Sequence, residues 1–492
     1  MIRLVLLTLF TIVCSAYAFR DWFKALCGLI LMMAVIEHPD MPKSMLGIQG
    51  LNPWNIIMLC VLLGWLVQRR REGLSWDMPG GLKFLLWIYV LLILVGVWRL
   101  LQDYSGLTAY ALLKEADPPT VGGLVSELIV NTLKWIIPAL LLFDGCRDNG
   151  RLRWALTAIA GVYFLLALQV IKWMPLAAIT SGADLGERSL KILMNEVGYH
   201  RVNIAVMLAG GAWAIFALRP LAKNRRVATL VTVASALTLF GLALTGGRAG
   251  YATWAVVGLL MALIRWRKYL LIAPIAVALV IAFVPAVQQR LMQGFTAETR
   301  DSNVALSHTV QIQSSGGADA YTITAGRNIA WPLVLDRIGQ APWFGYGREA
   351  MRSQGISGYL WGELGEDFGH PHNAYLQWLL DNGIVGAVPV FFFLLLMLKR
   401  SISLFADSRS PVFIAVGGMA LGLLFAQLVG ALGSQTFYPV EGSVGMWCAL
   451  GLMWRVHLER QRVYQPKPVF TEQGMVAVAR PAHPLWAEAP GT

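Results

Sequence analysis

Apolar runs long enough to cross a lipid bilayer recur through most of this chain. The bilayer core holds no water, so a spanning segment must satisfy its own backbone groups, as a helix of about 17–25 residues does. We therefore predict an all-α, polytopic integral membrane protein with about 12–13 transmembrane helices. The predicted spans lie near residues 3–19, 23–38, 52–68, 81–99, 123–143, 152–173, 203–219, 227–244, 249–265, 268–286, 374–398, 411–434 and 441–457.

Composition favours one helical membrane domain over separate soluble domains. Charged residues make up 14% of the 492 residues, whereas soluble proteins average about 25%. The five cysteines lie in or beside apolar spans without CxxC spacing, which predicts small buried hydrophobes rather than disulfides or a metal site. We predict transmembrane helices and short loops at 1–286, a large periplasmic loop at 287–373, C-terminal transmembrane helices at 374–460 and a disordered cytoplasmic tail at 461–492.

Lysine and arginine residues cluster in short loops, so the net charge of +12 does not indicate nucleic-acid binding. With the spans above, every basic cluster falls on one side of the membrane, which the positive-inside rule identifies as cytoplasmic. This places the C-terminus in the cytoplasm and residues 245–248, 287–373 and 435–440 outside. The clusters are Arg69 to Arg71, Arg147/Arg151/Arg153, Lys223/Arg225/Arg226, Arg265/Arg267/Lys268, Lys399/Arg400 and the residues from Arg455 onward.

The N-terminal apolar run resembles a signal peptide, because it ends in an A-x-A-like sequence at Ala16-Tyr17-Ala18. Cleavage there would leave Phe19 outside. Counting two helices back from the Arg69 cluster instead places Arg20 and Lys24 in the cytoplasm. This count favours a first helix that is retained.

The outer segment 287–373 is too long and too rich in aromatic rings to be a solvated linker. We expect short helices that pack as a lid over the bundle. The segment ends in Gly369-His370-Pro371-His372-Asn373, which places two of the seven histidines at the mouth of an apolar helix. Titratable groups beside a bilayer are costly and therefore indicate function. The alternative is a simple helix start, with Asn373 or His372 as the cap.

Two arginines face the same outer compartment. Arg248 lies in the tight turn Thr245-Gly246-Gly247-Arg248, and Arg327 lies at the predicted start of a helix in the large loop. The positive-inside rule disfavours arginine on this side, and glycines allow a ligand to approach the backbone. A guanidinium placed against the charge bias suggests an anion such as phosphate. The alternative is an arginine whose head group merely reaches the interface.

Four motifs in chain order carry a resemblance to a known family: TGGRAGY, GRNIAW, APWFGYG and HPHNAYLQWLLDNGIVG. Over about 203–390 the sequence resembles the O-antigen ligase and polymerase family of bacterial envelope glycosyltransferases. The resemblance implies a GT-C-like fold in the inner membrane and an undecaprenyl-diphosphate-linked glycan donor. It also implies that Arg248 and Arg327 contact the donor diphosphate, and that His372 acts on the acceptor hydroxyl on the periplasmic face.

The residue types suit this chemistry. Fixed cations stabilise a diphosphate leaving group as its negative charge grows, and imidazole is a suitable base for a hydroxyl nucleophile. Arginines that supply the charge remove the need for a metal, so we expect neither a metal nor another cofactor. The nearest acidic candidates, interpreted as solvated or as partners that orient a histidine, are Glu363, Glu366 and Asp367. Further substrate contacts are predicted at Arg201, Arg290, Asn373, Tyr251 and Trp331.

The acceptor stays open between lipid A–core for a ligase, a second lipid-linked glycan for a polymerase, and a protein side chain for an O-oligosaccharyltransferase. Polysaccharide-assembly proteins are expected partners. The competing class is a glycan transporter or flippase, which predicts ionisable residues at the midplane and broken helices in matching halves. A membrane scaffold without activity is the third alternative, and it leaves the outer arginines unexplained.

Overall fold

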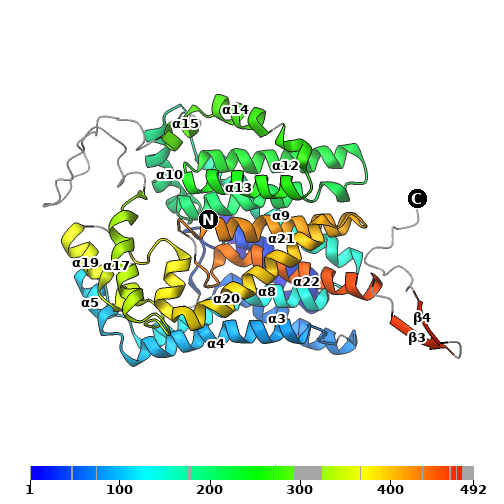
Figure 1. Ribbon diagram of the computed structural model, residues 1–492, viewed down its shortest axis with the longest axis horizontal. Helices are drawn as coiled ribbons and strands as arrows, with labels where there is room; N and C mark the ends of the chain where they lie inside the picture. The colour runs from blue at the N-terminus through cyan, green and yellow to red at the C-terminus, as the bar shows by residue number, and fades with distance from the viewer. Residues whose placement is uncertain are drawn as a thin grey trace.

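The computed structural model describes residues 2–45, 48–73, 75–175, 177, 180–271, 273–292, 324–365, 367–434, 436–464, 467–471 and 474–478. It is an all-α, polytopic membrane protein, as predicted from its apolar runs (Figure 1). The first fifteen α-helices are α1 (Ile2–Ala18), α2 (Trp22–Met32), α3 (Pro53–Arg71), α4 (Gly80–Gln102), α5 (Ser105–Leu113), α6 (Val121–Val125), α7 (Asn131–Leu133), α8 (Ile137–Gly145), α9 (Asn149–Trp173), α10 (Gly182–Glu196), α11 (Arg201–Phe216), α12 (Arg225–Leu244), α13 (Arg248–Ile264), α14 (Ala273–Phe283) and α15 (Pro285–Met292).

Three short helices and three long ones follow in the described part of the chain. They are α17 (Arg327–Gln340), α18 (Ala350–Ser353), α19 (Ile356–Leu364), α20 (Ala374–Ala406), α21 (Pro411–Gly430) and α22 (Val444–Tyr464). Single turns of 3-10 or π helix are η1 (Met33–Val35), η2 (Ser126–Val130), η3 (Lys134–Ile136), η5 (Arg219–Leu221), η6 (Arg267–Leu270) and η7 (Glu441–Ser443).

Helices occur at every predicted span, but their lengths differ from the prediction. In the described chain, 7 helices are long and apolar enough to cross a membrane, and three more apolar helices are shorter. The predicted span 268–286 holds η6 and then α14, which has only 11 residues. Such a helix rises about 16 Å and cannot cross the roughly 30 Å core alone. The 7 long spans are Gly80–Gln102, Val121–Gly145, Asn149–Trp173, Arg201–Leu221, Arg225–Leu244, Ala374–Ala406 and Pro411–Gly430.

The centre of the bundle is formed by α11 and α21, which approach closely through small residues. A Cβ added at Gly210 of α11 would lie 3.1 Å from the carbonyl oxygen of Gly422 and 2.8 Å from Cβ of Ala426. Membrane helices associate by van der Waals packing, so small residues that admit a neighbouring backbone hold them together. This packing fixes the position of α11, and with it the position of Arg201, the first residue of that helix.

The basic clusters meet at one end of the bundle, at the right of Figure 1 with the C-terminus. Asp77 forms ion pairs with Arg455 at 2.7 Å, Arg147 at 3.1 Å and Arg462 at 2.6 Å. Burial alone would raise the pKa of Asp77, but hydrogen bonds and charges of these arginines outweigh it and hold the pKa below its usual range. Clusters far apart in sequence therefore share one face, as the predicted topology requires.

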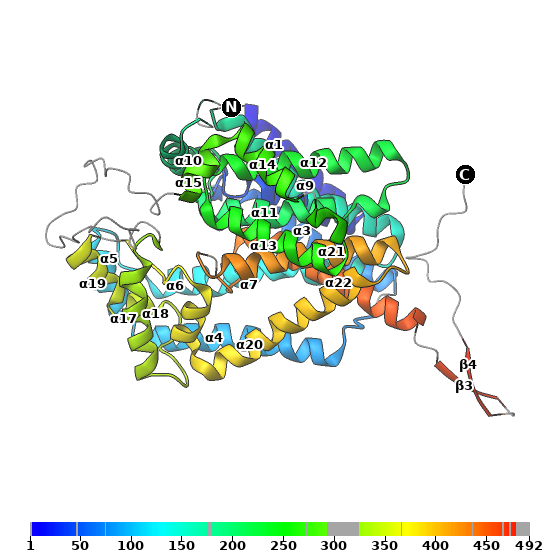
Figure 2. The same ribbon diagram turned by 45° about the horizontal axis from the view of Figure 1, so that its top comes forward.

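The lid contains α17, α18 and α19, which lie at the opposite end (Figure 2). Its core buries Val334, Met351 and Leu360 against Leu380 of α20. The three short helices agree with the prediction. Not every aromatic ring packs into the lid, because Trp343, Phe344 and Tyr359 are exposed. Residues 293–323 of the predicted loop lie outside the described residues.

Helix α20 is broken at Gly383, where φ is 62° and ψ is −170°. The uninterrupted span predicted at 374–398 is therefore wrong. The lid segment before α18 enters the break: the N–H of Ile384 donates to the oxygen of Pro342 at 2.8 Å, and that of Tyr346 to the oxygen of Leu380 at 2.9 Å. A Cβ at Gly383 would lie 2.4 Å from the oxygen of Trp343, so only glycine fits this close approach.

Four short strands complete the described chain. Strands β1 (Ser44–Met45) and β2 (Ile48–Gln49) pair antiparallel, and so do β3 (Lys467–Thr471) and β4 (Gly474–Val478). The last pair lies in the tail for which we expected no regular structure, with Lys467 opposite Val478. Residues 479–492 lie outside the described residues.

Candidate active site

Four arginines predicted from the sequence come together at the lid end of the bundle. Arg201, Arg248 and Arg327 are the first residues of α11, α13 and α17, and Arg290 lies in α15. Burial, followed by the charges of Arg201 and Arg248, lowers the pKa of Arg290 to about 10. Burial and the charge of Arg248 also lower the pKa of Arg327. Arg201, Arg248 and Arg290 thus lie within electrostatic reach of one another, and Arg327 lies within reach of Arg248; we call these four residues the arginine group.

Backbone carbonyl groups hold two members of the arginine group in place. The Nη1 of Arg201 donates to the oxygen of Gly186 at 2.6 Å, and the Nε of Arg290 to the oxygen of Gly246 at 3.3 Å. Gly186 lies directly against the guanidinium of Arg290: a Cβ there would lie 2.7 Å from Nη1 of Arg290, which would have to shift. The turn before Arg248 needs glycine for another reason, since Gly246 has φ 64°.

Two members of the arginine group, Arg201 and Arg327, form no ion pair with a carboxylate in the described part of the chain. Like charges held together at a half-buried site repel one another, so binding an anion there relieves the repulsion. Guanidinium groups match the geometry of phosphate oxygens.

Arg327 also joins the lid to the bundle. Its Nη1 donates to the oxygen of Thr324 at 2.8 Å, and its Nη2 donates to the oxygen of Gly433, after α21. One turn further along α17, the indole N–H of Trp331 donates to the oxygen of Pro371 at 2.9 Å. Trp331 thus holds the loop from His370 to His372, which we call the histidine loop. Its predicted role as a substrate contact stays a prediction.

His372 has a strained backbone. Its φ is 50°, in the left-handed region that few non-glycine residues adopt. Its N–H donates to Nδ1 of His370 at 3.1 Å, and the two rings lie 4.2 Å apart. Strain of this kind persists where the surroundings enforce it, and it gathers at active sites. Among the described residues, no hydrogen bond engages the ring nitrogens of His372, which leaves them available for a ligand.

Asn373 caps α20, as the alternative of a simple helix start predicts. Its Oδ1 accepts from the N–H of Tyr375 at 3.0 Å and of Leu376 at 3.2 Å. The next N–H, that of Ala374, donates to the oxygen of Ala431 at 2.8 Å. The helix start is therefore fixed on both sides, and the ring of His372 is held just outside it.

Both histidines are neutral at physiological pH. Burial, then the charges of His370 and Arg327, lowers the pKa of His372 to about 3. Burial also lowers the pKa of His370, to about 4, with opposing contributions from Glu349 and Arg352. A neutral imidazole can accept a proton, but burial and the positive charge of Arg327 make His372 a weak base as it stands. An anion bound to the arginine group would offset that charge and raise the pKa of His372.

The remaining candidates have other partners. The hydroxyl of Tyr251 donates to the oxygen of Ala243 at 2.7 Å, which closes the turn before Arg248. Asp367 accepts from Tyr110 at 2.7 Å and pairs with Lys114, so it ties the lid to α5. Glu363 forms no ion pair with a described residue, and Glu366 lies outside the described residues.

The sequence analysis missed a buried network at the break in α20. Asp381 is 1% exposed and accepts from the hydroxyl of Tyr438 at 2.9 Å and the N–H of Ala350 at 3.1 Å. Arg348 lies 3.7 Å from Asp381 and 3.3 Å from the ring centroid of Tyr438. The signal was present: Leu379-Leu380-Asp381-Asn382-Gly383 puts a carboxylate and a glycine inside an apolar span.

Comparison with known families gives one match. Residues 233–391 match the family described as O-antigen ligase. The matched segment contains Arg248, Arg290, Arg327 and His372, whereas Arg201 precedes it. No curated protein matches the chain.

Proposed function

We propose that this chain, whose residues 233–391 match the O-antigen ligase family, transfers a glycan from an undecaprenyl-diphosphate donor to an acceptor hydroxyl on the periplasmic face of the inner membrane. The observation that carries the proposal is the meeting of the arginine group with His372 at one end of the bundle. The arginine group is suited to bind a diphosphate, and His372 is suited to bind a hydroxyl.

In the proposed reaction, the acceptor oxygen attacks the anomeric carbon of the donor sugar. A new glycosidic C–O bond forms, and the bond from the anomeric carbon to the diphosphate oxygen breaks. The proton of the hydroxyl passes to the neutral ring of His372. Arg248 and Arg327 hold the diphosphate, whose charge grows as it leaves, so they stabilise the transition state more than the ground state.

The substitutions His372→Ala and Arg248→Ala test this proposal. Removal of a general base typically costs about 10²–10⁴-fold in rate, so the first variant should lose glycan transfer. Arg248→Ala should lose transfer through weaker donor binding. The assay is restoration of the surface glycan in a deletion strain, followed by transfer with purified protein, with the amount of folded protein measured in each case.

The matched control is His370→Ala. His370 Nδ1 accepts a backbone hydrogen bond and its ring is more buried, so it is assigned to support of the loop and its loss should be much milder. Activity that survives in His372→Ala but not in His370→Ala would reverse the assignment. Full activity in Arg248→Ala would remove the diphosphate role.

A further inference from the structure

Two adjacent aromatic side chains of the lid are exposed. Trp343 is 62% exposed and Phe344 is 65% exposed, in the segment that joins α17 to α18. Single exposed apolar side chains are normal on a protein surface, whereas a patch of large apolar groups indicates a contact surface. The neighbours of these two rings show what that surface contacts.

On one side, the two rings adjoin the membrane-facing surface of α20. The N–H of Val385 donates to the oxygen of Trp343 at 3.0 Å, so the lid backbone runs beside α20 just after its break. Val385 and Val388 are exposed on this helix, which is long and apolar enough to cross a membrane. Exposed apolar side chains on such a helix face lipid. Trp343 and Phe344 therefore extend the lipid-facing surface of α20 onto the lid.

On the other side, α4 fixes the depth of the lid segment. The Nη2 of Arg99 donates to the oxygen of Gly345 at 2.6 Å, and its Nη1 donates to the oxygen of Phe344. Helix α4 starts at Gly80, at the basic end of the bundle, and rises about 27 Å by Trp98. Because the hydrocarbon core is roughly 30 Å thick, Trp98, which is 61% exposed, lies near the membrane boundary at the lid end. Arg99 is the next residue, so the lid segment that it binds lies at this boundary.

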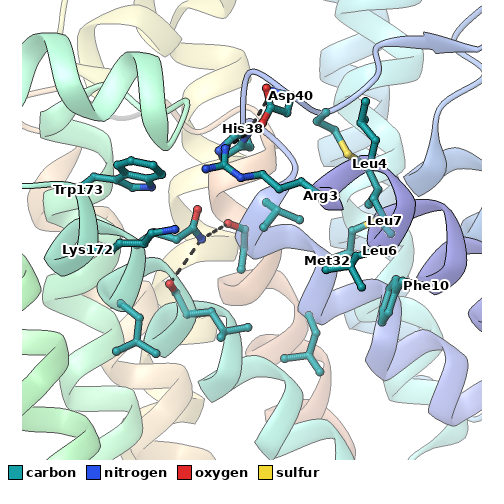
Figure 3. Close-up of a pocket in the computed structure, with 17 residues that line it drawn as sticks. Arg3, Leu4, Leu6, Leu7, Phe10, Met32, His38, Asp40, Lys172 and Trp173 are labelled. Carbon is teal, nitrogen blue, oxygen red and sulfur yellow. Dashed lines mark hydrogen bonds and ion pairs between the residues drawn. The ribbon is translucent and has the colours of Figure 1, made fainter. Parts of the chain in front are cut away.

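A second tryptophan marks the same boundary on another side of the bundle. Trp173 is the last residue of α9, a helix that starts at the basic end. Its ring centroid lies 4.5 Å from Nζ of Lys172 and 5.4 Å from the guanidinium carbon of Arg3, at the polar end of an apolar cavity between α1, α2 and α9 (Figure 3). Tryptophan with lysine or arginine at the end of a spanning helix is typical of the head-group layer. Trp98 and Trp173 therefore mark the depth of this layer, and the exposed lid segment lies at that depth.

We infer that Trp343 and Phe344 insert into the lipid head-group layer at the lid end of the bundle, so that the membrane surface is a binding partner of the lid. The patch is continuous with the lipid-facing surfaces of α4 and α20, which favours phospholipid over a second copy of the chain or another protein. Large aromatic rings are enriched in this layer of membrane proteins. Helix α17 is then held at both ends, at Arg327 by the bundle and after Gln340 by α20 and by lipid. The inference is independent of the chemistry proposed for His372.

Photo-crosslinking of the full-length protein in nanodiscs of phosphatidylethanolamine and phosphatidylglycerol tests the inference. Phe344 is replaced by benzoylphenylalanine, and the matched control is the same replacement at Tyr359, which is exposed on α19 at the outer end of the lid (Figure 1). The same replacement at Val388, on the lipid-facing surface of α20, is the positive control. The mass of each adduct identifies the trapped molecule. We expect at least about tenfold more phospholipid adduct at position 344 than at 359, the factor that corresponds to burial of one large apolar side chain.

Two outcomes of the cross-linking overturn the inference. One is phospholipid adduct at position 344 at the level found at 359, although position 388 gives its adduct. The other is a cross-link from position 344 to another protein chain in place of phospholipid. All three positions are exposed, so the replacements leave the packing of the lid and the bundle intact.

Hydrogen exchange in the same nanodiscs gives an independent measurement. The N–H groups of Tyr346, Gly347 and Arg348 donate to α20 and α4, so their exchange reports opening of the lid segment. Phe344→Asp should raise this exchange at least about tenfold, because a carboxylate does not replace an apolar ring in the lipid layer. Tyr359→Asp, the matched control, should leave the exchange unchanged. Unchanged exchange in Phe344→Asp would also overturn the inference.

Discussion

At the scale of single residues, His372 combines an unusual backbone with a depressed pKa. The left-handed φ of 50° turns its ring away from the helix that Asn373 caps, and burial keeps it neutral. The same residue could have been a cap, and the structure gives that part to Asn373 instead. Position, not residue type, separates the proposed base from its neighbour His370.

The pH dependence of kcat/KM should reflect this burial. A base is lost as the pH falls through its pKa, and kcat/KM reports the free protein. Because the pKa of His372 is lowered to about 3, activity should stay level as the pH falls from 7 toward about 5, whereas an imidazole in water would already be half protonated near 6.5. A half-loss of kcat/KM at about pH 6.5 would contradict a buried base.

The free energy of unfolding should also depend on the lowered pKa of His372, and it should decrease as the pH falls. Between the folded and unfolded pKa values the unfolded chain binds more protons, so the free energy of unfolding decreases as the pH drops below about 6.5.

Arg327→Lys should fail to restore transfer. One ammonium cannot contact Thr324, Gly433 and a diphosphate with the geometry of a guanidinium. Hydrogen bonds to charged groups contribute about 1.5–3 kcal/mol each, so we expect a loss of about 10- to 100-fold in kcat/KM for the donor. The matched control is Arg337→Lys, on the same helix, where Arg337 contacts Gln340 and Gln354 within the lid. Equal effects of the two substitutions would assign Arg327 to lid packing alone.

At the scale of elements, the break in α20 is what connects the lid to the bundle. A broken helix with a buried carboxylate is also a feature of transporters. Here the exposed backbone at the break is satisfied by residues 342–347, and Asp381 is paired with Arg348. The break in α20 is therefore the place where the lid is attached to the bundle.

Asp381→Ala should weaken the attachment of the lid to α20. It would leave Arg348, which is 7% exposed, without its nearest carboxylate, and breaking a buried ion pair costs about 3–5 kcal/mol. We expect a lower apparent Tm in detergent and faster proteolysis between Ala341 and Glu349. The control is Asp336→Ala, an exposed position on α17 whose side chain accepts a hydrogen bond from Gln340. An unchanged Tm in Asp381→Ala would show that the backbone hydrogen bonds alone hold the lid.

At the scale of the whole molecule, charge and site separate to opposite ends. Arg147, Arg455 and Arg462 pair with Asp77 at one end. The lid helix α17, which begins at Arg327, lies at the other end (Figure 1). If the lid end faces the periplasm, as we propose, the arginine group departs from the positive-inside rule, and a bound anion would explain this departure.

Reporter fusions test this arrangement. A fusion near residue 320, which lies outside the described residues, should report the periplasm, and one after residue 460 the cytoplasm, because charge bias in short loops sets orientation. A third fusion after Lys223, in a basic loop, should agree with the one at 460. If the fusions at 320 and 460 report one compartment, the topology is wrong and the site cannot be periplasmic.

The sequence by itself determined the class and the helix positions, and it supplied the residues of the proposed site. Hydropathy identifies spans because the bilayer forces backbone groups to pair locally, and four motifs in order predicted Arg248, Arg327 and His372. Only the tertiary structure decided that α20 is broken, because the break depends on hydrogen bonds between segments about 40 residues apart in the sequence. It also decided that Asn373 caps α20 and that Trp331 binds the loop before it at Pro371. The sequence marked the break only by Asp381 and Gly383 within an apolar span. The contacts that form the break join distant segments of the chain, and no local pattern records such contacts.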